Sequence, residues 1–238
     1  MSLSEINQRY LGMRIIFITG LFFLILRLNA QSVAADSLKA QNSDSTTQFI
    51  SLNADLADVP AAQDKSLGQK VGRGFLCAAV LDVTMLGSLL AMPESVSKWS
   101  PDTKFDRTRI KNQYTSTFVN PPHIDHDLWM INYVGHPYQG SIYYNSLRSQ
   151  GATIVQSSVF SLGQSLIWEY LIEGAMEQPS VQDLFVTPIL GTLLGELGHR
   201  ATLQMKKDGF RWYEKIATCV INPTYVVNNG FKIRKTNL

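Results

Sequence analysis

Charged residues are scarce in this sequence, and no long run of charge of one sign occurs in it. Asp, Glu, Lys and Arg make up 17% of the 238 residues, and the formal net charge is +2. A typical soluble domain has about a quarter of its residues charged. Nucleic-acid binding requires a concentrated basic face. We therefore expect no nucleic acid among the partners of this protein.

Several catalytic signatures are also missing. The sequence contains no His-Glu-x-x-His motif and no phosphate-binding glycine loop. Ser165 lacks the following glycine that would close a nucleophile elbow. Only two cysteines are present, Cys77 and Cys219, and each lies in an apolar stretch. They could pair in an exported protein, or remain buried as free thiols.

The N-terminus has the pattern of a secretory signal. Arg9 and Arg14 precede an apolar run over residues 15–26, and Ala30 supplies a small residue after it. A charged segment, a short apolar segment and a small residue at the cleavage point are typical of a signal peptide. We predict a signal peptide over 1–30 and hence export. Cleavage after Ala35 and an uncleaved membrane anchor are the alternatives.

The next segments differ sharply in composition. Residues 31–66 are rich in Ser, Ala, Asp and Gln, which predicts a disordered leader. Residues 67–122 are interpreted as an apolar helix followed by an irregular connector over 94–122. The apolar helix includes residues 74–92, whose only charge is Asp82. A stretch of this length is either a membrane span or a buried core helix.

Residues 123–231 are interpreted as the main domain, and 232–238 as a tail. Apolar residues recur here at helical spacing, and no series of alternating strands is present. The predicted fold class is all-α, a compact bundle of about five to six helices with glycine-mediated close packing. Gly151 is predicted to end one helix, and Ser180 to cap another. Residues 225–233 are left as a short strand or an extended tail.

A row of polar residues at four-residue spacing marks the predicted helix 152–177. Its members are Ser157, Ser161, Ser165, Glu169, Glu173 and Glu177. Residues four apart are neighbours on a helix surface, so this polar ridge is either a solvated face or a seam packed against another element. We favour the packed seam for residues 157–173 and an exposed position for Glu177.

A second row of the same spacing runs along the following predicted helix. It consists of Asp183, Thr187, Gly191, Gly195 and His199. Two glycines remove side chains and let another helix approach closely. The polar ridge is the expected partner of this glycine row. Packing of the two rows would bring Glu169 and Glu173 near Asp183, Glu196 or His199.

Two kinds of chemistry fit these residues. Glu196 and His199 have the carboxylate–imidazole spacing of helical metal sites, so they are candidate ligands of a divalent metal. Only one such pair is present, however, and we expect no resident cofactor. His136 precedes Pro137 at an expected helix start. It is either a helix cap or an acid–base group.

The C-terminal half also resembles a known family. The residues that carry the resemblance are Asn132-Tyr133-Val134-Gly135-His136-Pro137-Tyr138-Gln139-Gly140, Tyr143-Tyr144, Trp168-Glu169-Tyr170, Glu173, Pro179-Ser180, Asp183, Thr187-Pro188, Gly191, Gly195-Glu196 and Ile221-Asn222-Pro223. Residues 127–231 resemble the domain of unknown function 3943 family. The resemblance implies an exported envelope protein of Gram-negative bacteria of the Bacteroidetes type. It implies no reaction and no catalytic residue.

The expected function is therefore a structural or assembly role at the periplasmic face of the outer membrane, with an envelope protein or lipid as partner. The alternative is a membrane-associated hydrolase acting on lipid or glycan. Its candidate catalytic residues are His136, Glu169, Glu173, Asp183 and Glu196. The oligomeric state stays open, as does insertion of residues 74–92 into a membrane.

Overall fold

The computed structural model describes residues 65–102, 104–124 and 127–231. The predicted signal peptide, nearly all of the predicted leader and the C-terminal tail lie outside the described residues. No β-strand occurs within these ranges, and the all-α prediction is confirmed. The single β-bridge among the described residues joins His123 to Ser180.

The helices follow one another in a simple order. They are α3 (Leu67–Ala91), α4 (Glu94–Ser97), α5 (Arg107–Val119), the π-helix η1 (Ile131–Gly135), α6 (His136–Arg148), α7 (Ile154–Ile167), the π-helix η2 (Trp168–Ile172), the 3₁₀ turn η3 (Glu173–Ala175), α8 (Val181–Lys207), α9 (Trp212–Ile221) and α10 (Pro223–Asn229).

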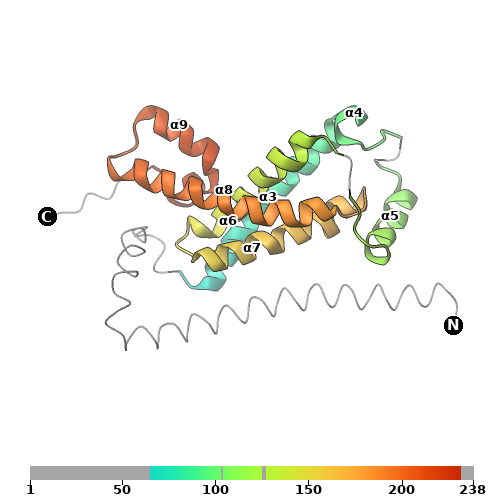
Figure 1. Cartoon of the computed structure of the whole chain (residues 1–238), viewed down its shortest axis with the longest axis horizontal. Coiled ribbons are helices and arrows are strands. Elements are labelled where there is room, and N and C mark those ends of the chain that lie inside the picture. Colours follow the sequence, from blue (N-terminus) through green and yellow to red (C-terminus); the bar gives the residue numbers. More distant parts are fainter. Residues whose placement is uncertain (1–64, 103, 125–126, 232–238) are drawn as a thin grey trace.

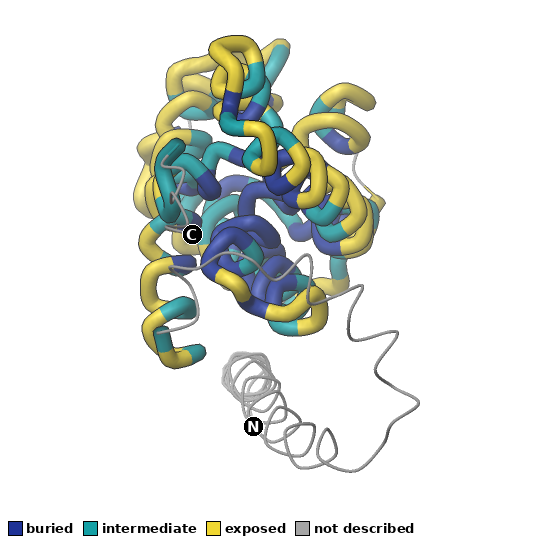
Figure 2. Tube along the Cα trace, turned by 90° about the vertical axis from the view of Figure 1, so that its left-hand side faces the viewer, coloured by how far each residue is buried: buried dark blue, intermediate teal, exposed yellow. Residues whose placement is uncertain are grey.

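Helix α6 is the centre of the bundle. It packs against α8, α7 and α3, and eleven of its thirteen residues are buried. Helix α9 lies at one end of the molecule, with α4 and α5 at the other (Figure 1). The buried residues gather on the central helices, and the outer helices carry most of the exposed ones (Figure 2).

Local signals begin and end these helices as expected. The side chain of Thr153 accepts a hydrogen bond from the backbone of Gln156 in a capping box at the start of α7. The side chain of Ser180 accepts from the backbone N–H of Asp183 and caps α8. Gly151 has a φ of 77° after α6, a conformation that favours glycine. The Ser180 and Gly151 predictions are confirmed.

Two predictions of irregular structure were wrong. The connector 94–122 contains α5, whose N-terminus is capped by the Asp106 side chain. Residues 225–229, expected to be extended, belong to α10, which Asn222 caps and Pro223 opens. Both helices are short or polar, so apolar periodicity does not reveal them.

Helix α6 begins at His136, one residue before the predicted start at Pro137, but the prediction of His136 as a helix cap was wrong. The chain is already helical before it, because η1 runs directly into α6. Pro137 has no N–H to donate to the carbonyl of Tyr133, and its ring would crowd that carbonyl. A wider π turn accommodates the missing backbone hydrogen bond at Pro137. His136 is therefore a buried residue inside a continuous helical run.

Glycine mediates the closest helix contact, as predicted, but the partner differs from the one expected. A Cβ built on Gly191 would lie 2.5 Å from the Cα of Gly140, and one built on Gly195 would lie 2.7 Å from the Tyr144 ring. Both partners are on α6. The expected partner, the polar ridge, also packs against α6, where Ser161 donates to the carbonyl of Gly140 at 3.0 Å.

The polarity of the bundle is inverted relative to that of a soluble protein: many buried side chains are polar, and many exposed ones are large and apolar. Its largest buried side chains include Gln139, Asn145, Gln164, Glu169 and His199. Tyr143 donates its hydroxyl proton to Asp82, the lone charge of the apolar segment 74–92, and Gln139 donates to the same hydroxyl at 2.8 Å. Interiors of soluble proteins are dominated by apolar side chains. In this bundle buried polar side chains, several of them hydrogen-bonded to one another or to the backbone, take up much of the interior.

Large apolar side chains lie outside instead. On α8 the exposed row is Phe185, Ile189, Leu193 and Leu197, each more than half exposed. Helix α3 exposes Leu76, Val80 and Val83, and α9 exposes Trp212, Ile216 and Val220. By length and composition α3 could cross a membrane, and only 17% of its most apolar window is buried. Of the two cysteines, both free thiols, Cys219 is exposed and Cys77 half-buried.

Candidate functional site

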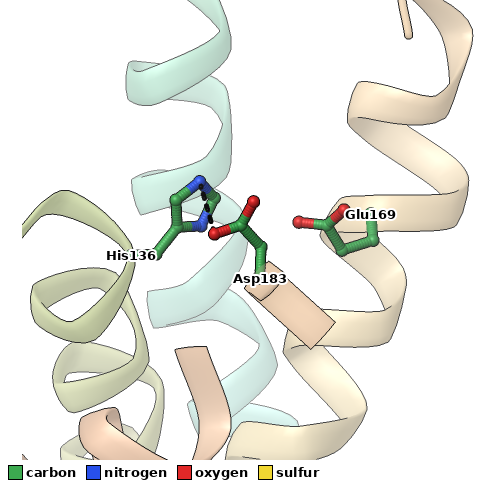
Figure 3. A group of neighbouring side chains, drawn as sticks. All are labelled: His136, Glu169 and Asp183. Atoms are coloured by element: carbon green, nitrogen blue, oxygen red, sulfur yellow. Dashed lines mark ion pairs between the residues drawn. The ribbon is translucent and has the colours of Figure 1, made fainter. Parts of the chain in front are cut away.

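Three residues from different elements converge inside the bundle. They are His136 at the start of α6, Glu169 in η2 and Asp183 in the first turn of α8. One ligand-type atom from each lies within 4.8 Å of the other two. The Nε2 atom of His136 is 3.6 Å from Oδ1 of Asp183. Figure 3 shows the Glu169 carboxyl group pointing toward that of Asp183. This set is called the His–Glu–Asp cluster below.

Each member of the cluster is held by a further contact. The Nδ1 atom of His136 is 3.1 Å from the hydroxyl of Thr187. The backbone N–H of Ser180 donates to Oε2 of Glu169 at 3.0 Å. The backbone N–H of Asp183 donates to the Ser180 hydroxyl at 3.2 Å. The N-terminus of α8 therefore positions both carboxylates, and Thr187 positions the ring.

Two π-helices, which are rare in proteins, lie at the cluster. His136 directly follows the π-helix η1, and Glu169 is a member of the π-helix η2. Well under 1% of residues in globular proteins are π-helical, and such turns occur frequently at functional sites. Both residues are buried at these π turns.

The cluster is closed to solvent. The exposed fractions are 6% for His136, 2% for Glu169 and 3% for Asp183. Carboxylates are costly to bury unless a partner or a cation compensates them. An imidazole with two carboxylates can exchange a proton or bind a cation, and in this enclosed position its interactions are stronger than in water.

Glu173, a predicted member of the site, lies outside the cluster. Its Oε2 accepts a hydrogen bond from the indole of Trp168 at 2.6 Å. Burial, together with the negative charges of Glu169 and Glu177, raises the pKa of Glu173 well above its usual value. In the structure Glu173 therefore contacts the Trp168 indole and not the cluster.

Glu196 and His199, the proposed metal pair, also lie outside the cluster. Glu196 accepts from Tyr144 at 2.6 Å and from Arg148 and Arg200 at 2.9 Å each. Burial raises its pKa, but hydrogen bonds from Arg148, Tyr144 and Arg200 outweigh this and lower it to about 2. Metal binding by this pair stays a prediction.

His199 is buried without hydrogen bonds. Neither of its ring nitrogens has a partner among the described residues, and the side chain is fully enclosed. Burial, and secondly the charge of Arg148, lower the pKa of His199 to about 3. The ring is therefore neutral and fills space beside the Arg148–Glu196 ion pair.

The polar ridge is a packed seam in its lower part. Ser157, Ser161, Ser165 and Glu169 are all buried, whereas Glu173 and Glu177 are partly exposed. Ser180 and Thr187, which hold the cluster, had no predicted role in it. Thr187 stands one helical turn after Asp183, so the row spacing was the signal that could have indicated it.

Residues 121–224 match the model of the domain of unknown function family DUF3943. The matched segment contains the whole cluster, and the match supports the resemblance that the sequence predicted. No curated protein and no solved structure matches the chain.

Proposed function

We propose that this protein is an exported helical component of the Gram-negative cell envelope with a structural or assembly role at the periplasmic face of the outer membrane. In this proposal it associates with lipid through the exposed apolar faces of its helices. The carrying observation is the inverted polarity of the bundle, and the evidence is clearest on α8.

Helix α8 has two contrasting faces. Its inner row is Asp183, Thr187, Gly191, Gly195 and His199, all buried. Its outer row is Phe185, Ile189, Leu193 and Leu197, at 63%, 55%, 59% and 67% exposure. A helix on the surface of a soluble protein places its apolar stripe toward the core. The arrangement on α8 is the one expected when the outer medium is itself apolar.

The distribution of these faces favours lipid over one protein partner. Exposed apolar rows occur on three helices, α3, α8 and α9. Monomeric soluble proteins rarely expose large contiguous apolar areas. A bilayer can cover the apolar faces of several helices at once, which favours lipid as the partner.

The junction between α8 and α9 supplies groups suited to a membrane surface. Lys206 and Lys207 end α8, and Trp212 and Tyr213 begin α9, with Arg211 between them. Trp212 is 74% exposed and Tyr213 is 45% exposed. Aromatic and basic side chains are enriched at the headgroup level of membranes, and basic residues attract anionic lipids.

Flotation with liposomes tests the association. The wild-type chain should float with vesicles that contain anionic phospholipid. The double substitution Leu193→Gln and Leu197→Gln should reduce the floated fraction several-fold, because it removes apolar area from the outer row. A matched control, Asn112→Gln with Thr115→Gln on the exposed face of the polar helix α5, keeps the net charge and should leave flotation unchanged.

Two results would count against the proposal. One is a wild-type chain that stays soluble and monomeric in the absence of lipid or detergent and does not float. The other is equal loss of flotation in the α8 and α5 variants. Carbonate extraction of native membranes then separates surface attachment from insertion of α3, because only an inserted helix resists it.

A second candidate function is a membrane-associated hydrolase acting on lipid or glycan. The convergence of His136 with Asp183 and Glu169 favours it, since acid–base groups must lie within reach of one another. The enclosure of the cluster counts against it, because a substrate would require an opening movement. His136→Gln should abolish lipid or glycan hydrolysis with an unchanged unfolding temperature; absence of any hydrolysis by the wild type would remove this candidate.

A further inference from the structure

We infer that the His–Glu–Asp cluster is a binding site for a divalent transition-metal ion. The ligands are Nε2 of His136 and one carboxylate oxygen each from Glu169 and Asp183. The site differs from the Glu196–His199 pair considered from the sequence. It rests neither on membrane association nor on a hydrolase activity.

The spacing of the three atoms suits a metal ion. Zinc binds imidazole nitrogen and carboxylate oxygen at about 2.0–2.2 Å, so tetrahedral ligand atoms lie roughly 3.3–3.6 Å apart. The Nε2 atom of His136 and Oδ1 of Asp183 are 3.6 Å apart. All three ligand atoms fall within 4.8 Å.

The contacts behind the three ligands are those of a prepared site. Metal-binding histidines use their second nitrogen for a hydrogen bond that fixes the ring. Here Nδ1 of His136 faces the Thr187 hydroxyl at 3.1 Å, which leaves Nε2 directed at Asp183. Glu169 is oriented in the same way by the Ser180 N–H. All three ligands lie on helical segments, at the start of α6, in η2 and in the first turn of α8.

The charge of the cluster also favours a divalent cation. Two carboxylates lie together at 2% and 3% exposure beside one imidazole. A divalent ion bound between them would compensate both carboxylates and accept the imidazole nitrogen as a ligand. Mixed imidazole and carboxylate ligands suit zinc, manganese and iron better than calcium or magnesium.

Metal titration of the untagged full chain in detergent is the first test. After chelation and dialysis, the wild type should bind about one equivalent of Zn²⁺. X-ray absorption of the zinc-loaded protein should show one imidazole and otherwise oxygen ligands. Binding of less than about a tenth of an equivalent, or a spectrum without imidazole, would overturn the inference. Both readouts use the wild type and do not depend on the folding of any variant.

Substitutions then assign the ligands. Glu169→Gln and Asp183→Asn should each weaken zinc binding at least about 10-fold, and Thr187→Val should weaken it about 10-fold by releasing the ring. Glu173→Gln and His199→Asn are matched controls outside the cluster and should bind zinc as the wild type does. Equal weakening in the controls, with native circular dichroism, would place the metal elsewhere and contradict the assignment.

Discussion

The central helix α6 and the outer face of α8 are opposites in both position and chemistry. Helix α6 is buried on nearly every side, and it presents His136, Gln139, Ser141, Asn145 and Ser146 to the interior. The outer face of α8 is exposed and presents only Phe, Ile and Leu at its four-residue spacing. In a soluble bundle the two compositions would be exchanged.

This contrast shows what holds the bundle together. Apolar burial is confined to small clusters among the described residues, such as Leu147 with Ala152 and Phe160, and Leu203 with Phe210 and Tyr225. The contact between α6 and α8 depends instead on backbone proximity and hydrogen bonds, including the one from Asn145 to the carbonyl of Gly195 at 3.1 Å. Helices in lipid associate by the same means.

The largest effect is expected where α6 and α8 touch. A Cβ added at Gly140 would collide with the carbonyl group of Thr187, and backbone cannot yield as a flexible side chain does. Gly140→Ala should therefore cost about 3 kcal/mol of unfolding free energy or more. Chemical unfolding in detergent measures it. A variant as stable as the wild type would break the claim that close backbone contact holds the two helices.

Gly87 provides the control for this prediction. It lies within α3, and a Cβ there meets nothing within 4 Å. Gly87→Ala should stabilise the protein by about 0.5–1 kcal/mol, because alanine is the better helix former. Equal destabilisation by both substitutions would mean that packing space does not decide the outcome.

An intermediate effect is expected at the ion pair between the two helices. Arg148 and Arg200 contact opposite oxygens of Glu196, with side chains that are 15% and 52% exposed. Arg148→Met should cost about 2 kcal/mol, since it leaves an enclosed carboxylate short of a partner. Arg200→Met should cost less than about 1 kcal/mol. Equal costs would contradict the view that the inner pair is the structural one.

A pH-dependent effect, absent at neutral pH and growing as the pH falls, is expected at His199. Its pKa is about 3 in the folded protein against 6.5 for an ordinary histidine, so between these values the unfolded chain binds a proton that the folded chain does not. The contribution of His199 to the free energy of unfolding is fully present above pH 6.5. It falls by about 1.4 kcal/mol per unit as the pH drops below that value.

His199→Leu isolates this contribution. The substitution removes a buried ring without hydrogen bonds and should leave stability at pH 7 within about 1 kcal/mol of the wild type. The decline between pH 6.5 and 5 should disappear, whereas the contribution of Glu196, whose pKa is about 2 against 4.5, is still lost as the pH falls below 4.5. An unchanged decline in the variant would assign the effect to other groups.

Much of this arrangement could be predicted from local sequence signals. The all-α class, the Gly151 turn, the Ser180 cap and the buried serine ridge follow from spacing and capping rules that act over a few residues. Three of the five predicted catalytic candidates converge, because His136, Glu169 and Asp183 happen to lie at the same end of the bundle.

The errors arose where the outcome depends on distant contacts. The glycine row could dock on any helix, and only the fold places α6 opposite it. The π turns depend on side-chain packing and on Pro137, and no sequence periodicity indicates them. The exposure of the apolar rows could not be predicted either. An apolar stripe at helical spacing is normally the face that packs on the core, so the sequence alone does not indicate that it is exposed.

The fluorescence of the four tryptophans tests the inverted polarity most directly. Trp99 and Trp168 are 2% and 1% exposed, whereas Trp129 and Trp212 are 68% and 74% exposed. Single-tryptophan variants, with the others replaced by phenylalanine, can be reconstituted in vesicles that contain brominated lipid. We predict strong quenching of Trp212 and little quenching of Trp168. Quenching of Trp212 by aqueous iodide and not by brominated lipid would contradict the account.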